Sequence, residues 1–214
     1  MLALLDERPM HPYEMYQLLV ARREDLLVKV RPGSLYHAVA RLADEEMVAA
    51  EGTDRAGNRP ERTTYRITDS GRTALRGRIA ELLSTPVREY PIFRLALAEA
   101  HSLPREEVVA LLGERVARLG HELADIEMLL DWTRERAMPR RYCVVLEYMH
   151  ATLRAELTWI EGFAAELGGG AIEWEEFDPA TGARVIVDAG TENDWPGREP
   201  GPPRPRWAGS PAHG

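Results

Sequence analysis

A short segment that begins with proline is the feature that most constrains how this chain can fold. Pro32–Leu42 reads PGSLYHAVARL, and its apolar residues Leu35, Val39 and Leu42 recur three and four positions apart. Proline favours the first turn of a helix, and this spacing places the apolar side chains on one helical face. The remaining positions carry hydroxyl, imidazole and guanidinium groups. The segment therefore predicts a short helix with one buried face and one hydrogen-bonding face, as a DNA recognition helix requires.

The sequence on either side predicts the rest of a winged helix-turn-helix. Upstream, Tyr13–Val20 has apolar residues at helical spacing, which indicates a supporting helix. Downstream, Met47–Glu51 and Thr63–Thr68 are expected to pair as two strands around the polar tip Asp54–Pro60. Two helices followed by a hairpin with a basic tip are the elements of a winged helix.

The same residues resemble the PadR-type family of bacterial transcription regulators. The resemblance covers residues 1–83 and rests on an ordered set: Arg8–Met15, Pro32–Tyr36, Arg41–Leu42, Met47–Val48, and Tyr65–Thr68 with Gly71. Each string alone is short, but the whole set in this order is specific. The resemblance implies a DNA-binding regulator, a repressor, that dimerises through C-terminal helices.

The chain departs from the family pattern at two places. Family members usually have glycine before the hydrophobic pair Met47–Val48, whereas this chain has Glu46, for which a left-handed helix cap is harder. The first helix is also short, because Met1–Leu5 leaves barely a turn and a half before Pro9. We expect either a clipped first helix or a start further upstream.

The net charge of −8 does not exclude DNA binding, because the acidic residues are concentrated downstream. Residues 1–83 carry 13 basic and 13 acidic side chains, residues 84–170 carry 10 and 14, and residues 171–214 carry 4 and 8. Within residues 28–43 three side chains are basic and none is acidic. Since affinity for nucleic acid depends on neutralising phosphates, a basic surface on a neutral domain is expected.

The candidate DNA-binding residues lie around the predicted recognition helix and the wing. They are Tyr13, Lys29, Ser34, Tyr36, His37, Arg41, Arg55, Arg59 and Arg62. Ser34 and His37 lie on the helical turns that would enter the groove, and the wing arginines can reach the minor groove or adjacent phosphates. The alternatives are that Tyr36 packs on the wing, that Tyr13 caps the small domain, and that the others are simply exposed.

The region after the wing is predicted to be helical. Arg72–Leu83 forms a linking helix, and a coiled-coil seam follows from Pro104 to Arg136. Its seam residues are Val109, Leu112, Val116, Leu119, Leu123, Ile126 and Leu130. A second helix is expected from Pro139 to Leu167. The two helices can pack as an antiparallel hairpin, and two hairpins can form a homodimer that would favour a palindromic operator.

Trp132 and Trp159 on these helices are candidates for binding a small-molecule effector, because some PadR-type proteins bind planar aromatic compounds between dimer helices. The alternative is that both rings belong to the dimer core. A metal site from His121 with Asp125 and Glu147 with His150 is the weaker hypothesis. We predict no metal and no cofactor, and a buried apolar role for Cys143.

Composition excludes several classes. There is no apolar run of about 18 residues and no signal peptide, and the single cysteine cannot form an intrachain disulfide, so we expect a cytoplasmic protein without a membrane segment. No Gly-rich phosphate loop, nucleophile-elbow serine or metalloprotease helix occurs, so we predict no enzyme.

The sequence thus predicts a mostly α fold in four parts. Residues 1–83 form the winged helix-turn-helix, 84–170 a helical dimerisation and effector domain, 171–189 a β-hairpin, and 190–214 a disordered tail rich in proline and glycine. The expected function is repression by a dimer on a palindromic operator, with release by an effector. The alternatives are a winged helix that binds protein, and a metal- or redox-responsive sensor.

Overall fold

The computed structural model describes residues 1–29, 31–54, 62–178 and 180–185. The chain divides into two compact units, with the boundary after Glu89. The wing arginines Arg55 and Arg59 and the predicted tail over residues 190–214 lie outside the described residues.

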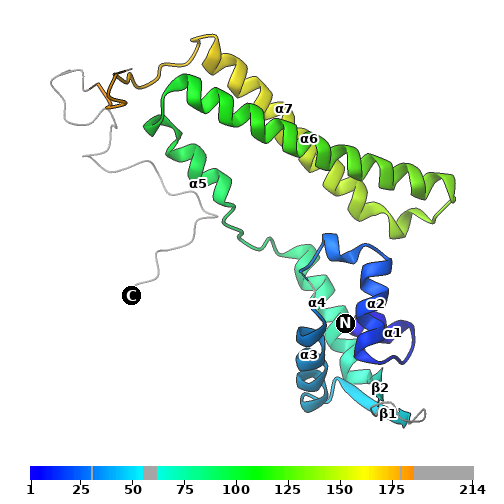
Figure 1. Cartoon of the computed structure of the whole chain (residues 1–214). Helices are drawn as coiled ribbons and strands as arrows, with labels where there is room; N and C mark the ends of the chain where they lie inside the picture. Colours follow the sequence, from blue (N-terminus) through cyan, green and yellow to red (C-terminus); the bar gives the residue numbers. More distant parts are fainter. Residues whose placement is uncertain (30, 55–61, 179, 186–214) are drawn as a thin grey trace, which may run out of the picture. The chain divides into compact units, whose positions relative to one another are not determined.

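The first unit contains all the elements predicted for a winged helix-turn-helix (Figure 1). They are α1 (Leu2–Glu7), α2 (Pro12–Ala21), the 3-10 turn Glu24–Leu26, α3 (Pro32–Asp44), β1 (Val48–Asp54), β2 (Arg62–Ile67) and α4 (Asp69–Ser84). Proline stands at the start of both α2 and α3, and the residue before each proline is extended, as proline demands of its neighbour. The two strands pair antiparallel, with a register shift between Ala50 and Gly52.

A single apolar core holds this unit together. Its buried members are Leu4, Leu5, Met10, Met15, Leu19, Leu35, Val39, Val48 and Ile67. Leu35 and Val39, the predicted inner face of α3, are 5% and 1% exposed, and Leu42 packs partly buried against them. The predicted inner face of α3 is therefore confirmed.

The end of α3 is a left-handed turn centred on Glu46, which has φ 55°. The Met47 N–H donates to the Leu42 carbonyl at 2.8 Å, and the Glu46 N–H donates to the Ala43 carbonyl at 3.0 Å. This is the hydrogen-bond pattern of a helix end that normally uses glycine at the left-handed position. Glu46 thus occupies the conformation that the family pattern predicted, without the residue that adopts it most easily.

The start of α4 is fastened to the base of the wing. The Thr68 hydroxyl oxygen accepts the Gly71 N–H at 3.0 Å, and the Thr68 N–H donates to the Met47 carbonyl at 3.1 Å. Gly71 lies so close to Met47 that a Cβ atom there would be 2.1 Å from the Met47 carbonyl oxygen. Only glycine allows this approach.

Met10 links the N-terminal helices to the wing. Its N–H donates to the Tyr65 carbonyl at 3.0 Å, and its carbonyl accepts the Tyr65 N–H at 3.2 Å. The segment between α1 and α2 is therefore held against β2, which fixes where α2 begins.

The second unit is built on a long antiparallel hairpin of α6 and α7, with the shorter α5 before it (Figure 1). The helices are α5 (Ile92–Ala98), α6 (Arg105–Glu135) and α7 (Val144–Gly168), with 3-10 turns at Ala100–Ser102 and Arg140–Tyr142. The predicted start of the last helix at Pro139 is wrong. Pro139 is extended, and one tight turn separates it from Val144.

Two apolar clusters join α6 to α7. They are Val108, Leu112, Ile160 and Leu167 near one end, and Ile126, Leu130, Leu153 and Leu157 near the other. The predicted seam is confirmed at Leu112, Ile126 and Leu130, whereas Val109 is only half-buried because Val108 takes the inner position. The seam is completed within one chain, and the partner helix is α7.

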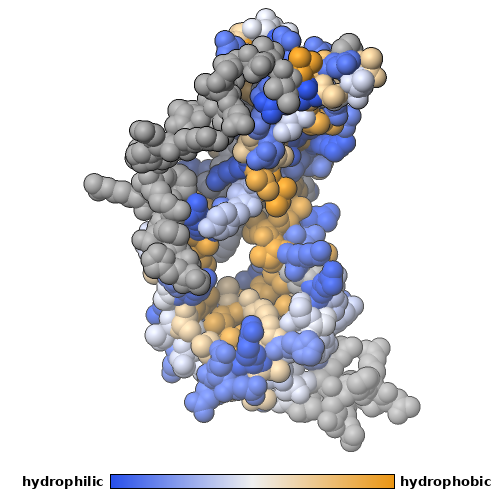
Figure 2. Space-filling model, turned by 90° about the vertical axis from the view of Figure 1, so that its left-hand side faces the viewer, coloured by the Kyte–Doolittle hydropathy of each residue, from blue (hydrophilic) through white to orange (hydrophobic). Residues whose placement is uncertain are grey.

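Large apolar side chains of the second unit remain exposed in the single chain. They include Leu95, Leu111, Met128, Trp132, Tyr148 and Trp159. Figure 2 shows orange, hydrophobic atoms at the surface among blue hydrophilic ones. None of the described helices combines the length and apolarity needed to cross a membrane.

The segment after α7 folds back on the start of α6. The indole N–H of Trp174 donates to the Leu103 carbonyl at 2.8 Å, and its ring packs near Phe163. The predicted hairpin over residues 171–189 is represented by one bridge, Phe177 with Arg184, around a turn in which the Asp178 carboxylate accepts the Ala180 N–H. No strand forms in the described part of this segment.

Candidate nucleic-acid interface

The outward face of α3 lies opposite Leu35 and Val39. At 100° per residue, Gly33, His37 and Asp44 project furthest from the core, with Ala40 beside them, and all four are exposed. A Cβ atom at Gly33 would have no neighbour within 4 Å. The middle of this face is therefore low in bulk, with the His37 imidazole as its polar group, which suits close approach to a groove.

The other predicted residues of α3 fall on two separate flanks. Ser34 and Arg41 are seven positions apart and share one flank, whereas Tyr36 lies about 200° around the helix from Ser34. The Ser34 hydroxyl donates to the Arg31 carbonyl at 2.7 Å, so its proton serves the first turn of α3 in the free protein. The sequence treated these residues as one set, but the structure separates Tyr36 from the rest.

The flank with Tyr36 faces the start of α2. The rings of Tyr36 and His11 meet edge to face, with centroids 5.7 Å apart and planes at 73°. Tyr36 remains 45% exposed. The prediction left open whether Tyr36 packs on the wing, and its ring contact is instead with His11.

Tyr13 lies in the first turn of α2 and is 43% exposed, with its ring tilted toward Tyr16 at 6.4 Å. Two exposed tyrosines thus occur at the N-terminus of α2 and beside it on α3. The N-terminus of a helix carries partial positive charge, which favours a phosphate group nearby.

The basic residues around α3 are free to meet an anion. Lys29, Arg31 and Arg41 are exposed and form no ion pair among the described residues. Elsewhere in this unit, an arginine forms an ion pair within the protein. Arg22 donates two hydrogen bonds, of 2.6 and 2.7 Å, to the Glu7 carboxylate and lowers the pKa of that carboxyl. The acidic residues along α3 come at its C-terminal end: Asp44 is its last residue, and Glu45 and Glu46 follow it.

Only part of the predicted wing surface lies within the described residues. Arg62 is the first residue of β2, and Arg66 further along that strand is exposed. Because Arg55 and Arg59 are outside the described residues, their contact with DNA stays a prediction.

Residues 1–77 match the family described as the transcriptional regulator PadR-like family. The first unit of the chain therefore resembles the PadR-like family. The family is described as one of transcriptional regulators.

Several solved structures have a fold similar to that of this chain over most of its length. Bacillus subtilis PadR in complex with operator DNA has 19% sequence identity and a TM-score of 0.66, covering 78% of this chain and 94% of that chain. Bacillus subtilis PadR in complex with p-coumaric acid has 18% identity and a TM-score of 0.64, covering 78% and 95%. The Vibrio cholerae virulence activator AphA has 17% identity and a TM-score of 0.57, covering 79% and 96%. No curated protein matches the chain by sequence.

The two tryptophans predicted for effector binding do not lie together in this PadR-like chain. Trp132 is near the end of α6, where the Arg136 guanidinium lies 4.3 Å above its ring. Trp159 is one turn beyond Glu156 on α7, and Glu156 pairs with Arg115 near the middle of α6. At 1.5 Å per residue the two residues are roughly 30 Å apart along the hairpin. Within one chain they are not parts of one site.

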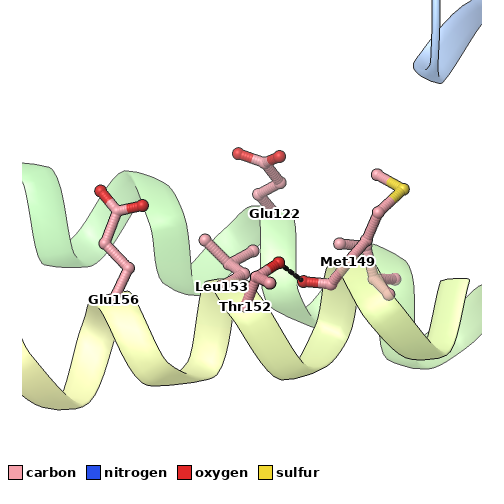
Figure 3. A pocket seen from close by; sticks show the side chains of 6 residues that line it. Glu122, Met149, Thr152, Leu153 and Glu156 are labelled. Carbon is pink, nitrogen blue, oxygen red and sulfur yellow. Dashed lines mark hydrogen bonds between the residues drawn. The ribbon is translucent and has the colours of Figure 1, made fainter. Parts of the chain in front are cut away.

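A shallow pocket of about 190 Å³ lies between the two long helices. It is lined by Glu122, Ile126, Met149, Thr152, Leu153 and Glu156. In Figure 3 the carboxyl groups of Glu122 and Glu156 extend to the same side, and the Thr152 hydroxyl bonds the Met149 carbonyl at 3.1 Å. Neither candidate tryptophan lines this pocket.

Two of the four residues considered for metal binding, Glu147 and His150, have other partners. Glu147 pairs with Arg140 at 2.8 Å, and His150 bonds Glu127 at 3.0 Å, where Arg154 also binds. In the part of the chain that the structure describes, no group of three or more histidine, cysteine or carboxylate side chains is placed to hold a metal. Cys143 is buried, with its sulfur 3.9 Å from the Pro139 carbonyl.

Sequence reasoning missed His11 as part of this surface. The sequence indicated His11 only as one residue of the Arg8–Met15 motif. Its ring contact with Tyr36 joins two segments 25 positions apart, and no local pattern reveals such a contact.

Proposed function

We propose that this PadR-like chain is a repressor that binds a palindromic operator as a homodimer and is released by a small-molecule effector. The observation that carries the proposal is the surface of α3: small residues and His37 face outward, and the unpaired cations Lys29, Arg31 and Arg41 surround them. Groove binding needs both features, since a helix must enter closely and phosphates must be neutralised.

Charge along α3 supports one orientation on DNA. Lys29 and Arg31 precede the helix, whereas Asp44 and Glu45 end it. A carboxylate close to phosphate is repelled, so the N-terminal half of α3 is the half that enters the groove. His37 then lies where base edges are read, and Tyr36 and Tyr13 lie toward the backbone.

The exposed apolar side chains of the second unit support assembly with a second copy. Leu111, Met128 and Tyr148 remain exposed after α6 and α7 have packed together. Large apolar side chains that remain exposed on a single chain are candidates for burial against a partner. A twofold dimer would place two α3 helices about 34 Å apart, one turn of DNA, which requires a palindromic site.

The helical unit is the proposed place for effector binding. An effector that binds better to one arrangement of the two recognition helices shifts the population toward it, and lowers operator affinity if that arrangement does not fit DNA. A relative was crystallised with p-coumaric acid, and another is described as an activator, so both the ligand and the sign of regulation need direct tests.

The first experiment is fluorescence anisotropy with the DNA upstream of the gene and a scrambled duplex, each at two salt concentrations. We expect tighter binding to the upstream DNA, weakening with salt. Arg31→Ala should lower affinity for both duplexes and reduce the salt slope by about 1. Arg118→Ala removes the same charge from an exposed site on α6 and is the matched control. Equal effects of the two variants would refute the assigned interface.

Whether the protein represses transcription and whether it forms a dimer need separate measurements. Transcription from the upstream promoter in vitro should fall when the protein is added, and a rise would overturn repression while leaving DNA binding intact.

Sedimentation should give a dimer, and replacing both Leu111 and Met128 with aspartate should yield monomers. A dimer that survives this change would place the interface elsewhere.

A further inference from the structure

His11 performs two tasks at the start of α2. Pro12 fixes the first helical residue and forces His11 into an extended conformation, φ −81° and ψ 148°. In this conformation the His11 side chain reaches over the helix end, and its Nδ1 atom accepts the Tyr13 N–H at 3.1 Å. The imidazole therefore caps α2, satisfying one of the N–H groups that a helix start leaves open.

The same ring also contacts the recognition helix. It meets the Tyr36 ring edge to face, at a centroid distance of 5.7 Å, and this geometry is favourable for two aromatic rings. The residues usually preferred at a helix N-cap are serine, threonine, aspartate and asparagine, and none of them has a ring. Histidine combines a cap acceptor with an aromatic surface.

The position of His11 is itself held from both sides. Met10 forms two backbone hydrogen bonds with Tyr65 of β2, and Pro12 is buried in the domain. The Tyr36 ring therefore rests on a residue whose backbone is tied to the wing and whose side chain is tied to α2. Through this contact, the positions of the wing and of α2 together determine where the exposed Tyr36 ring of α3 lies.

We propose that His11 is a positioning residue that holds the Tyr36 ring in the orientation that meets the DNA backbone. The proposal rests on the proposed DNA-binding function. Because an exposed tyrosine can rotate about two side-chain bonds, a ring held in advance loses less freedom when DNA binds. Removal of the His11 ring then weakens operator binding without any loss of a direct DNA contact.

Three variants separate the two tasks of His11. His11→Asn keeps a cap acceptor and removes the ring, so we expect an unchanged melting temperature and operator affinity lower by about 3- to 10-fold. His11→Phe keeps a ring edge and removes the cap, so it should melt lower and yet bind the operator within about twofold of wild type. Affinity is measured below the melting temperature of every variant.

The decisive readout is the dependence on Tyr36. If His11 acts through Tyr36, His11→Asn has no further effect on operator affinity in a Tyr36→Ala background. An equal loss in both backgrounds, or wild-type affinity for His11→Asn, overturns the proposal.

A measurement without DNA separates this proposal from the proposed function. The NMR signals of the Tyr36 ring should shift in His11→Asn, because the neighbouring ring is lost. Unchanged signals overturn the positioning role even if the operator binds. A wild-type protein that binds no DNA, although the signals shift, overturns the proposed function and with it the positioning role, while the ring contact stands.

Discussion

Replacing Gly71 with alanine should loosen the junction between α4 and the base of the wing. A methyl group at this position would lie 2.1 Å from the Met47 carbonyl oxygen and 2.9 Å from a side-chain carbon of Ile67. Since ordinary contact begins at 3.4 Å, the helix and the carbonyl must separate by about 1 Å. The two hydrogen bonds from Thr68 to the Met47 carbonyl, at 3.0 and 3.1 Å, stretch with that movement.

The free energy can be worked from these contacts. Overpacking costs about 1–3 kcal/mol, and each weakened hydrogen bond up to about 1 kcal/mol. Alanine gains about 1 kcal/mol over glycine in helix propensity, so the net loss is about 2 kcal/mol. Gly77 lies in the same helix with no atom within 4 Å of an added Cβ. Gly77→Ala is therefore the matched control and should stabilise by about 1 kcal/mol.

Amide hydrogen exchange is the suitable assay, because every tryptophan lies at or after Trp132 and fluorescence would report the other unit. Peptides covering β2 and the start of α4 should exchange about 30-fold faster in Gly71→Ala, and more slowly than wild type in Gly77→Ala. If both variants protect these peptides equally, the close approach of Gly71 to Met47 does not limit the stability of the junction and the reasoning is refuted.

Three further predictions concern stability. Glu46→Gly should stabilise the first unit by about 0.5–1 kcal/mol, because φ 55° is strained for glutamate; unchanged exchange at the end of α3 would contradict this. Trp174→Phe keeps the ring and removes its hydrogen bond to Leu103, so urea unfolding followed by the remaining tryptophans should show a loss of about 1 kcal/mol. The Arg22 guanidinium holds the pKa of Glu7 below its ordinary 4.5, so the ion pair stabilises above pH 4.5 and is lost as the pH falls through the lowered value. Thermal melts at about pH 6 and about pH 3.5 should therefore differ less in Glu7→Gln than in wild type, and an equal difference would exclude this ion pair as a source of acid sensitivity.

Much of the first unit could be predicted because its signals are local. The prolines at positions 12 and 32 mark helix starts through their fixed φ, and the period of Leu35, Val39 and Leu42 marks the inner face. Each of these depends on covalent geometry or on neighbours within a few positions. The left-handed conformation of Glu46 was not predicted from its residue type, because glutamate replaces the glycine that usually marks such a helix end.

The failures occurred where packing between distant segments chooses among local possibilities. Val108 and Val109 fit a helical seam equally well, and α7 selects the first. The separation of Trp132 from Trp159 within one chain is also set by the antiparallel pairing of α6 and α7, so the sequence did not specify it.

The sequence by itself determined which segments of the first unit form helices and strands, where α3 begins, and which of its faces is buried, since these follow from backbone chemistry and periodicity. Tertiary structure alone decided that the Tyr36 ring rests on His11, and that Gly71 lies against the Met47 carbonyl. Both contacts join residues more than 20 positions apart, so they exist only after the chain has folded and brought those surfaces together.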